Sequence, residues 1–444
     1  MNHKIIFVFC YILLLAMWIY PEAPDLKFKY VTVEDGLSQG SINCIFQDSR
    51  GFLWFGTKQG LNKYDGVDID IFDHDPFDQT SLSNNNVSCI TEDKKGDLWI
   101  GTSAGLNRFD YAAQRFARYI ANPLDENSLK DEVIISLLVD SEGFIWIGTE
   151  LGLDRFDPES GIFRHFKCNP GDPYSISRGG VQVLFEDKAG CIWVGTSQGL
   201  DRFEKGKEGF KHFDHDENKN PLSTLIDVHQ DQQERFLFLF QGIGLCEFDY
   251  ETECIVPIEL DPSIREKLSK LPFNHMCKDQ LGRFWLETLY HGIFILDIDD
   301  NELFDIGTGS DKKINDGLSH GNKLSIYSER GGSIIIGTDG TGAILWHPYL
   351  QKFKQFRHDP DDPSSLGLSS VRAVHEDREG NLWIGGYAGL DKYDRRSEKF
   401  SHFFDRGDYT KSIPGAVLVF CEDFDEPFKT LWMGTEAHYL IKFD

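Results

Sequence analysis

Two segments of the sequence have the residue pattern of a serine-hydrolase nucleophile. Residues 101–105 and 195–199 both read Gly-x-Ser-x-Gly. A nucleophile elbow needs a strand that turns directly into a helix, which exposes the serine hydroxyl. Each segment here joins two strand-like runs, and the equivalent positions elsewhere in the chain are Lys58 and Tyr387. The two serines are therefore predicted to be turn residues, and no catalytic residue is predicted.

Loops rich in Asp, Asn and Pro offer the oxygen ligands that calcium prefers. Their acidic residues are not spaced as in a D-x-D-x-D-G loop, and the same residue types are those that tight turns require. We therefore predict turn chemistry, with no metal ligands and no cofactor. These loops are residues 74–82, 122–129, 169–176 and 358–366.

Nine cysteines are present, and none has a Cys-x-x-Cys metal or redox spacing. Cys44 and Cys89 stand at equivalent places before Ile45 and Ile90, where a small apolar side chain suits a packed strand. Cys246 and Cys254 are close enough in sequence for a local hairpin disulfide in an oxidising compartment.

These residues all lie within a repeat that occurs nine times. Its clearest copy, residues 93–110, contains the segment Leu-Trp-Ile-Gly-Thr. The positions equivalent to its tryptophan follow each other at intervals of 45 to 50 residues, and seven of the nine tryptophans in the chain occupy them. They are Trp54, Trp99, Trp146, Trp193, Phe238, Trp285, Ile335, Trp383 and Trp432. A fixed period of this length indicates that one supersecondary unit is stacked along the chain.

Each unit is predicted to form four short strands. A strand with two apolar residues three apart precedes an Asp- and Gly-containing turn, and the Trp-Ile-Gly-Thr strand follows it. A Gly-Leu-x-x-Phe/Tyr strand and a strand with two aromatic residues complete the unit, and no helix is expected. Four antiparallel strands in this length are typical of a propeller blade, so the fold class is an all-β propeller; a straight β-solenoid is the alternative.

The number of blades in the ring is left open. Residues 28–32 have the pattern of a fourth strand, and residues 439–444 that of a third strand. If residues 28–32 complete the unit around Ile335, residues 28–352 form a seven-bladed propeller and residues 353–444 form two further blades. If they pair with the C-terminal strand, a nine-bladed ring closes, since such pairing removes open sheet edges.

Composition and the N-terminus limit the partners and the location. The formal net charge is −27, and no run of Lys and Arg provides a basic surface for nucleic acid. Residues 5–20 are apolar and follow His3 and Lys4. This is the length of a signal-peptide core and is short for a membrane span. Residues 1–23 are therefore predicted to be a signal peptide or an uncleaved N-terminal anchor, and the protein to be periplasmic or extracytoplasmic.

The repeats resemble those of the two-component regulator propeller family. The resemblance rests on residues 98–102 with Gly105-Leu106, on the linking residues 81–83, and on the opening residues 28–38, and it extends over residues 28–444. It implies a seven-bladed propeller over residues 28–352, with residues 353–444 as the start of a truncated second propeller. It also implies the periplasmic sensor region of a hybrid two-component histidine kinase, for which oligosaccharides are frequent ligands. The sequence given contains no phosphoacceptor helix, nucleotide lid or helix-turn-helix motif, so no kinase activity is expected of it.

The functional prediction is an extracytoplasmic propeller that binds a carbohydrate-derived ligand and signals through a kinase or propeller partner, or as a homodimer. The alternatives are a stand-alone binding propeller and a propeller glycosidase or lyase. Three units depart from the repeat, at Phe238, Ile335 and the lengthened turn before Trp432. A ligand could lie at such a unit, but no binding residue is predicted.

Overall fold

A computed structural model describes most of the chain after the predicted export segment, which lies outside the described residues. The described residues are 28–230, 235–289, 291–306, 325–347, 356, 358, 364–368, 370–378, 380–387, 389–394, 399–403, 413, 415–422 and 430–443. The chain divides into two compact units, residues 1–351 and 352–444. Within the described ranges no helix is both long and apolar enough to cross a bilayer.

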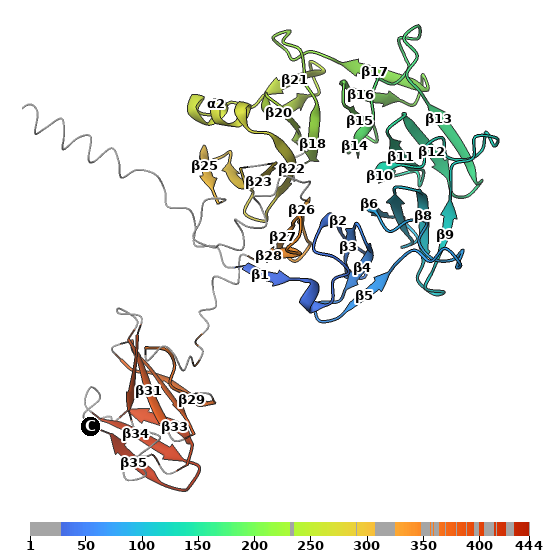
Figure 1. Ribbon diagram of the computed structural model, residues 1–444. Coiled ribbons are helices and arrows are strands. Elements are labelled where there is room, and N and C mark those ends of the chain that lie inside the picture. Colours follow the sequence, from blue (N-terminus) through green and yellow to red (C-terminus); the bar gives the residue numbers. More distant parts are fainter. Residues whose placement is uncertain are drawn as a thin grey trace, which may run out of the picture. The chain divides into compact units, whose positions relative to one another are not determined.

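The first unit is a ring of antiparallel sheets, each with four strands (Figure 1). We call each sheet a blade and number the blades in chain order. Blade 1 contains β2 (Ile42–Gln47), β3 (Leu53–Thr57), β4 (Gly60–Tyr64) and β5 (Ile69–Phe72). Blade 2 contains β6 (Val87–Glu92), β7 (Leu98–Thr102), β8 (Gly105–Asp110) and β9 (Arg115–Tyr119). Blade 3 contains β10 (Ile134–Val139), β11 (Ile145–Thr149), β12 (Leu153–Asp157) and β13 (Ile162–Phe166).

The remaining blades of this unit follow the same order. Blade 4 contains β14 (Val181–Glu186), β15 (Ile192–Thr196), β16 (Gly199–Glu204) and β17 (Gly209–Phe213). Blade 5 contains β18 (Leu225–Gln230), β19 (Phe236–Phe240), β20 (Gly244–Asp249) and β21 (Cys254–Pro257). Blade 6 contains β22 (Phe273–Lys278), β23 (Phe284–Thr288), β24 (Ile293–Asp297) and β25 (Glu302–Asp305). Blade 7 contains β26 (Ser325–Ser328), β27 (Ile334–Gly337), β28 (Ala343–Trp346) and β1 (Phe28–Val31).

The first strand of the chain closes this ring. Strand β1 pairs with β28, with Phe28 opposite Trp346 and Val31 opposite Ala343. Blade 7 also bonds to blade 1, where the Ile42 amide donates to the Thr338 carbonyl at 3.0 Å. The strand at the C-terminal end of the chain, β35 (Leu440–Phe443), pairs instead with β34 (Leu431–Thr435) of the second unit.

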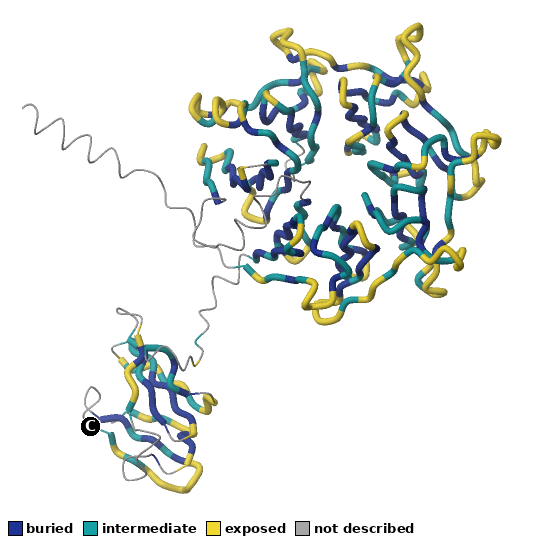
Figure 2. The backbone as a smooth tube through the Cα atoms, viewed as in Figure 1, coloured by how far each residue is buried: buried dark blue, intermediate teal, exposed yellow. Residues whose placement is uncertain are grey.

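The ring is held by apolar packing between consecutive blades. Trp146 of blade 3, for example, is buried in a cluster with Val181, Val194 and Phe203 of blade 4. Figure 2 shows that the buried residues concentrate in the middle of each sheet, while the outer loops are exposed. Because each blade covers one face of the next, the ring buries both faces of every sheet, which explains the aromatic and β-branched middle strands.

The repeated tryptophan has a polar anchor as well as an apolar environment. Its indole Nε1 donates to Oδ2 of an aspartate six residues earlier, and the same carboxylate accepts backbone amides of its turn. In blade 3, Asp140 Oδ2 accepts from Trp146 at 2.8 Å, and Oδ1 accepts from the amides of Glu142 and Phe144 at 2.9 Å. The same indole bond joins Asp48 to Trp54, Asp93 to Trp99, Asp187 to Trp193, Asp279 to Trp285 and Asp377 to Trp383, at 2.8–3.0 Å.

A helix in the first unit corrects the expectation that no unit contains one. Helix α2 (Pro262–Lys270) lies between β21 and β22, and a short 3-10 helix, η1 (Val33–Asp35), follows β1. Asp261 caps α2, since its Oδ1 accepts from the Ser263 amide at 2.8 Å. Leu268 is the buried residue of α2 and packs with blades 5 and 6. The Asp-Pro-Ser start of α2 has the composition of the linking turns, so composition alone could not distinguish a helix start from a turn.

The second unit contains two blades in its described part. Blade 8 contains β29 (Val371–Glu376), β30 (Leu382–Gly386), β31 (Gly389–Asp394) and β32 (Lys399–Phe403). Blade 9 contains β33 (Val417–Glu422), β34 and β35. Val374 on the first strand of blade 8 is 60% exposed, whereas its equivalent in blade 1, Ile45, is 9% exposed. The difference follows from the packing, because in the ring a neighbouring blade covers this position.

Candidate functional site

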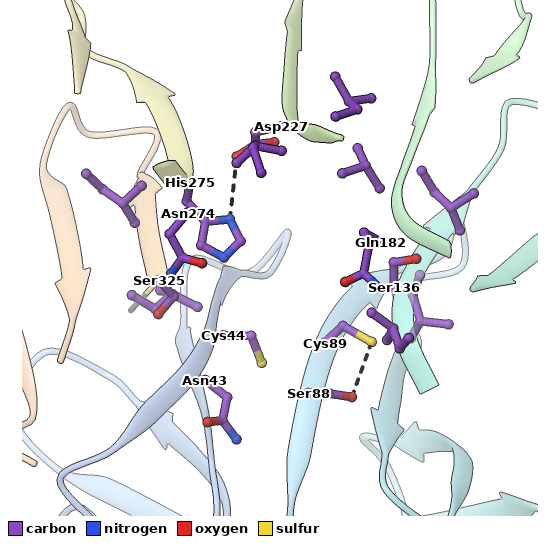
Figure 3. A pocket seen from close by; sticks show the side chains of 18 of the residues that line it. Asn43, Cys44, Ser88, Cys89, Ser136, Gln182, Asp227, Asn274, His275 and Ser325 are labelled. Atoms are coloured by element: carbon purple, nitrogen blue, oxygen red, sulfur yellow. Dashed lines mark hydrogen bonds and ion pairs between the residues drawn. The ribbon is translucent and has the colours of Figure 1, made fainter. Parts of the chain in front are cut away.

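The first strands of all seven blades in the ring line a central cavity of about 500 Å³ (Figure 3). Most lining residues occupy the first four positions of these strands, and Ser197 and Thr224 lie in loops next to them. Its hydrogen-bonding side chains come from several blades and include Asn43, Ser88, Ser136, Gln182, Asp227, Asn274, His275 and Ser325.

The repeat controls which side chains fit beside this cavity. The first strand of each of blades 1 to 6 contains a register shift, and the residue after the shift lies opposite the glycine position of the Trp-x-Gly-Thr strand. In blade 1, Cys44 lies opposite Gly56. A Cβ on Gly56 would collide with the Cys44 sulfur and would lie 2.6 Å from Val87 Cγ1 of the next blade. Glycine is thus required where two blades meet.

Blades 5 and 6 break this rule. At the glycine position blade 5 has Leu239, opposite Asp227, and blade 6 has Glu287, opposite His275. In blades 1 to 4 the residues opposite the glycine are uncharged: Cys44, Cys89, Ser136 and Val183. The charged side chains of the cavity region therefore gather where blades 5 and 6 meet.

Asp227 connects the two divergent blades. Its Oδ1 accepts from the Val228 amide at 2.8 Å, and its Oδ2 accepts from the Met276 amide of blade 6 at 3.0 Å. His275 Nδ1 lies 3.5 Å from Asp227 Oδ2. Figure 3 shows His275 and Asn274 across the cavity from Gln182 and Ser136. The Asp227 side chain is 24% exposed, so part of its carboxylate reaches the cavity.

Glu287 is a buried acid behind this wall. Its carboxylate accepts from Asn274 Nδ2 at 3.2 Å on each oxygen, and the residue has no exposed surface. Burial raises the pKa of Glu287 to about 7. The charge of Asp227 raises this pKa further, whereas His275 and the Asn274 bond oppose the shift. Glu287 therefore changes its charge near neutral pH.

The arrangement is suited to binding rather than to glycoside hydrolysis by two carboxylates. Such hydrolysis needs two carboxyl groups that flank the same bond of the substrate. Asp227 reaches the cavity, but Glu287 is buried behind Asn274 and does not line it. Among the described residues, the cavity lining presents one carboxylate together with amides, hydroxyls and an imidazole, which can hydrogen-bond to a polar ligand.

The serines of the Gly-x-Ser-x-Gly segments lie in turns, as the sequence predicts. Ser103 connects β7 to β8, and its hydroxyl accepts from Asn86 Nδ2 at 2.6 Å. Ser197 connects β15 to β16 and lies at the mouth of the cavity. Both are followed by strands, so neither has the geometry of a nucleophile elbow.

A Ser-His-Asp cluster that the sequence does not reveal is also structural. His212 Nδ1 lies 2.6 Å from Asp201 Oδ1 and 3.1 Å from Ser177 Oγ, and its Nε2 lies 3.1 Å from the Pro173 carbonyl. Both ring nitrogens are thus occupied by neighbouring groups. Blade 3 repeats the His–Asp pair with His165 and Asp154, and blade 8 with His402 and Asp391. The pair fastens the linking loop to its blade.

The acidic linking loops within the described residues use their oxygens for turns, while most of loop 358–366 lies outside the described residues. Asp78 Oδ1 accepts from the Thr80 amide at 2.8 Å, and Asp125 Oδ1 accepts from the Asn127 amide at 2.9 Å. Among the described residues no group of His, Cys, Asp and Glu has the geometry to hold a metal ion.

The suggested disulfide between Cys246 and Cys254 is wrong. Both thiols are free. In the β20–β21 hairpin Cys254 lies opposite Asp249, three residues along the strand from Cys246. Three residues span about 10 Å of a strand, which is more than a disulfide can bridge. Cys44 and Cys89 are free thiols on the first strands of adjacent blades and line the cavity.

The sequence contains a signal for the charged residues where blades 5 and 6 meet. It lies in Leu239, the residue after Phe238, and in the equivalent Glu287, and not in Phe238 itself. Aligning the nine units at their tryptophan position places both at a glycine. Asp227 and His275 stand out only once the strand register shows that they face those two positions.

The fold and the central cavity define a β-propeller with four-stranded blades, and comparison with known proteins shows which repeats its blades resemble. The profile of the family described as two component regulator propeller matches residues 36–59, 81–104, 128–150, 175–198 and 365–388. These five repeats are thus two component regulator propeller repeats. Over 68 residues the chain is 44% identical to histidine kinase P4 of Formosa agariphila, a stretch that is 15% of this chain and 5% of that protein.

Solved structures show the same fold. The extracellular domain assigned to a hybrid two component system of B. thetaiotaomicron aligns over 94% of this chain and 53% of its own, with a TM-score of 0.60 and 23% identity. Virginiamycin B lyase from Staphylococcus aureus aligns over 72% of this chain and 99% of its own, with a TM-score of 0.51 and 13% identity. The chain thus spans about half the length of the first domain. These likenesses establish the propeller fold and exclude the β-solenoid.

Proposed function

We propose that this chain is an extracytoplasmic sensor propeller of a two-component system and that it binds a carbohydrate-derived ligand in the central cavity. The observation that carries the proposal is the ring of hydrogen-bonding side chains from several blades around one cavity. Its volume of about 500 Å³ falls within the roughly 300–1,000 Å³ of small-molecule sites. The apolar residues 5–20 and the similarity to extracellular domains support the location.

The test is calorimetric titration of the full chain with a panel of oligosaccharides, comparing the protein with Gln182→Ala and Gln114→Ala. The Gln182 side chain is exposed to the cavity, so its loss is expected to weaken binding about tenfold, the value of one hydrogen bond to a ligand. Gln114 lies in an exposed turn of blade 2 and serves as the control. Binding that neither variant changes would place the ligand elsewhere, and the absence of binding across the panel would contradict the proposal.

The signalling partner in this proposal is a kinase module, reached through another propeller or through a second copy of the chain. Sedimentation analysis with and without the bound saccharide tests the second route, because a ligand-driven dimer would change the sedimentation coefficient. A monomer under both conditions would favour the stand-alone binding protein. Turnover of the saccharide, measured by chromatography of the ligand after incubation, would favour the lyase or glycosidase alternative.

A further inference from the structure

We infer that the ligand of the central cavity is a saccharide with a positively charged amino group, and that this group binds at the wall formed by blades 5 and 6. The inference rests on the proposed function and specifies the chemistry of its ligand. It follows from the distribution of charge, free acceptors and ring-stacking surfaces around the cavity.

The charged groups of the cavity lie on one side. Asp227 and His275 are the ionisable acid and base in the lining, and among the described lining residues there is no Lys or Arg. The opposite wall is uncharged and consists of hydroxyl, amide, thiol and apolar side chains such as Ser88, Ser136 and Gln182. An acidic saccharide would therefore bring its charge beside a carboxylate without a strong cation to balance it.

Asp227 retains the capacity to accept further hydrogen bonds. A carboxylate has about four acceptor positions, and the bonds from the Val228 and Met276 amides use two of them. The nearest basic side chain in the lining is His275, whose Nδ1 is 3.5 Å from Asp227 Oδ2, which is long for a hydrogen bond. An ammonium group on the ligand supplies three donors and the charge that this acceptor lacks.

Two further features favour such a ligand. Glu287 lies behind the same wall and adds negative charge there when it is ionised. No Trp, Tyr or Phe lines the cavity in the described part of the chain. Ring stacking on aromatic side chains is thus absent from this lining, and the affinity must come from polar contacts, to which a charged donor contributes most.

The test compares three disaccharides of similar size by calorimetric titration of the full chain: a glucosamine dimer, its N-acetylated counterpart and a digalacturonate. We expect the glucosamine dimer to bind at least about tenfold more tightly than the acetylated dimer, as one charge-assisted hydrogen bond provides. The digalacturonate should bind most weakly. The experiment is run at pH 7, where the ammonium is largely protonated.

Asp227→Asn and a matched control separate this inference from the proposed function. Asparagine keeps an acceptor oxygen for one of the two backbone amides that bond to Asp227, and thermal unfolding verifies that the variant folds. Asp227→Asn should bind the glucosamine dimer and its N-acetylated counterpart about equally. Glu251→Gln, in an exposed turn of blade 5, should still bind the glucosamine dimer about tenfold more tightly than the acetylated dimer. Equal or tighter binding of the digalacturonate, or a preference that persists in Asp227→Asn, overturns the inference and leaves the proposed function intact. Binding of none of the three also overturns the inference, and binding of another saccharide of the wider panel would then leave the proposed function intact.

Discussion

Blades 1 to 4 differ from blades 5 and 6 in the residue at the glycine position, where neighbouring blades pack against each other. In the first group a glycine in the Trp-x-Gly-Thr strand lets the next blade approach, and the residue opposite is small or apolar. In the second group Leu239 and Glu287 occupy that position, and Asp227 and His275 lie opposite them. The contrast occurs within one ring, with the same strand order in every sheet.

The recurring residues of the repeat serve the packing of the blades. Contacts between blades require the glycine and the tryptophan. They therefore recur because of packing and not because of ligand binding. A side chain that replaces the glycine needs room and, if charged, polar partners. Glu287 has such partners in Asn274 and His275, which shows that the wall between blades 5 and 6 is built around polar groups.

The largest effect is expected when the glutamate found at the glycine position of blade 6 is introduced at the same position of blade 3. Gly148→Glu in blade 3 would place a Cβ against the Ser136 hydroxyl and 2.8 Å from the Val181 carbonyl oxygen, and would bury a carboxylate without a cation. We expect a loss of about 4 kcal/mol in the free energy of unfolding, measured in urea. Gly206→Glu is the control, since nothing lies within 4 Å of a Cβ at Gly206. Equal stability of the two variants would show that the glycine is not a packing requirement.

The second prediction concerns how the free energy of unfolding depends on pH through Glu287 in blade 6. Folded Glu287 keeps its proton up to a pKa of about 7, whereas an unperturbed Glu releases it near 4.5. The folded state thus binds more protons between these values, and its stability falls as the pH rises from 4.5 to 7, by about 3 kcal/mol. Glutamine does not titrate. The free energy of unfolding of Glu287→Gln should therefore equal that of the unsubstituted protein at pH 4.5 and exceed it by about 3 kcal/mol at pH 8.

Urea unfolding at several pH values measures this difference, and Glu251→Gln in an exposed turn is the control, for which no such pH dependence is expected. The groups that face Glu287 are His275, Asn274 and Asp227. A stability difference that stays constant with pH would mean that Glu287 is ionised throughout, so blade 6 would carry a permanent buried charge.

The smallest of the three effects concerns the indole anchor that blade 5 lacks at Phe238. Trp146→Phe copies that residue into blade 3 and leaves Asp140 Oδ2, which is buried, without the bond from Nε1. We expect a loss of about 2 kcal/mol, the cost of an unsatisfied buried acceptor. The control is Tyr174→Phe, which removes a polar atom from an exposed ring and should change stability by less than about 0.5 kcal/mol. Thermal unfolding with equal losses in both would show that the anchor contributes little.

Much of the fold was predictable because the repeat is local. Two residues of the turn, Asp140 and Gly143, and the tryptophan that follows specify a hairpin turn, and the bonds of this turn lie within seven residues. The helix α2 was missed because its Asp-Pro-Ser start resembles a linking turn, and because its burial depends on contacts of Leu268 with blades 5 and 6. Helix formation there is decided by tertiary packing rather than by propensity.

By itself the sequence determined the four-stranded unit, its ninefold recurrence and the type of repeat, since strand pattern and turn chemistry act over a few residues. Only the tertiary structure decided that β1 completes blade 7, and that Asp227, Asn274 and His275 share one wall of a cavity with Glu287 behind it. The physical reason is the ring itself. It brings together residues from strands almost 50 positions apart, and their side chains acquire a common environment only when the blades are packed around the axis.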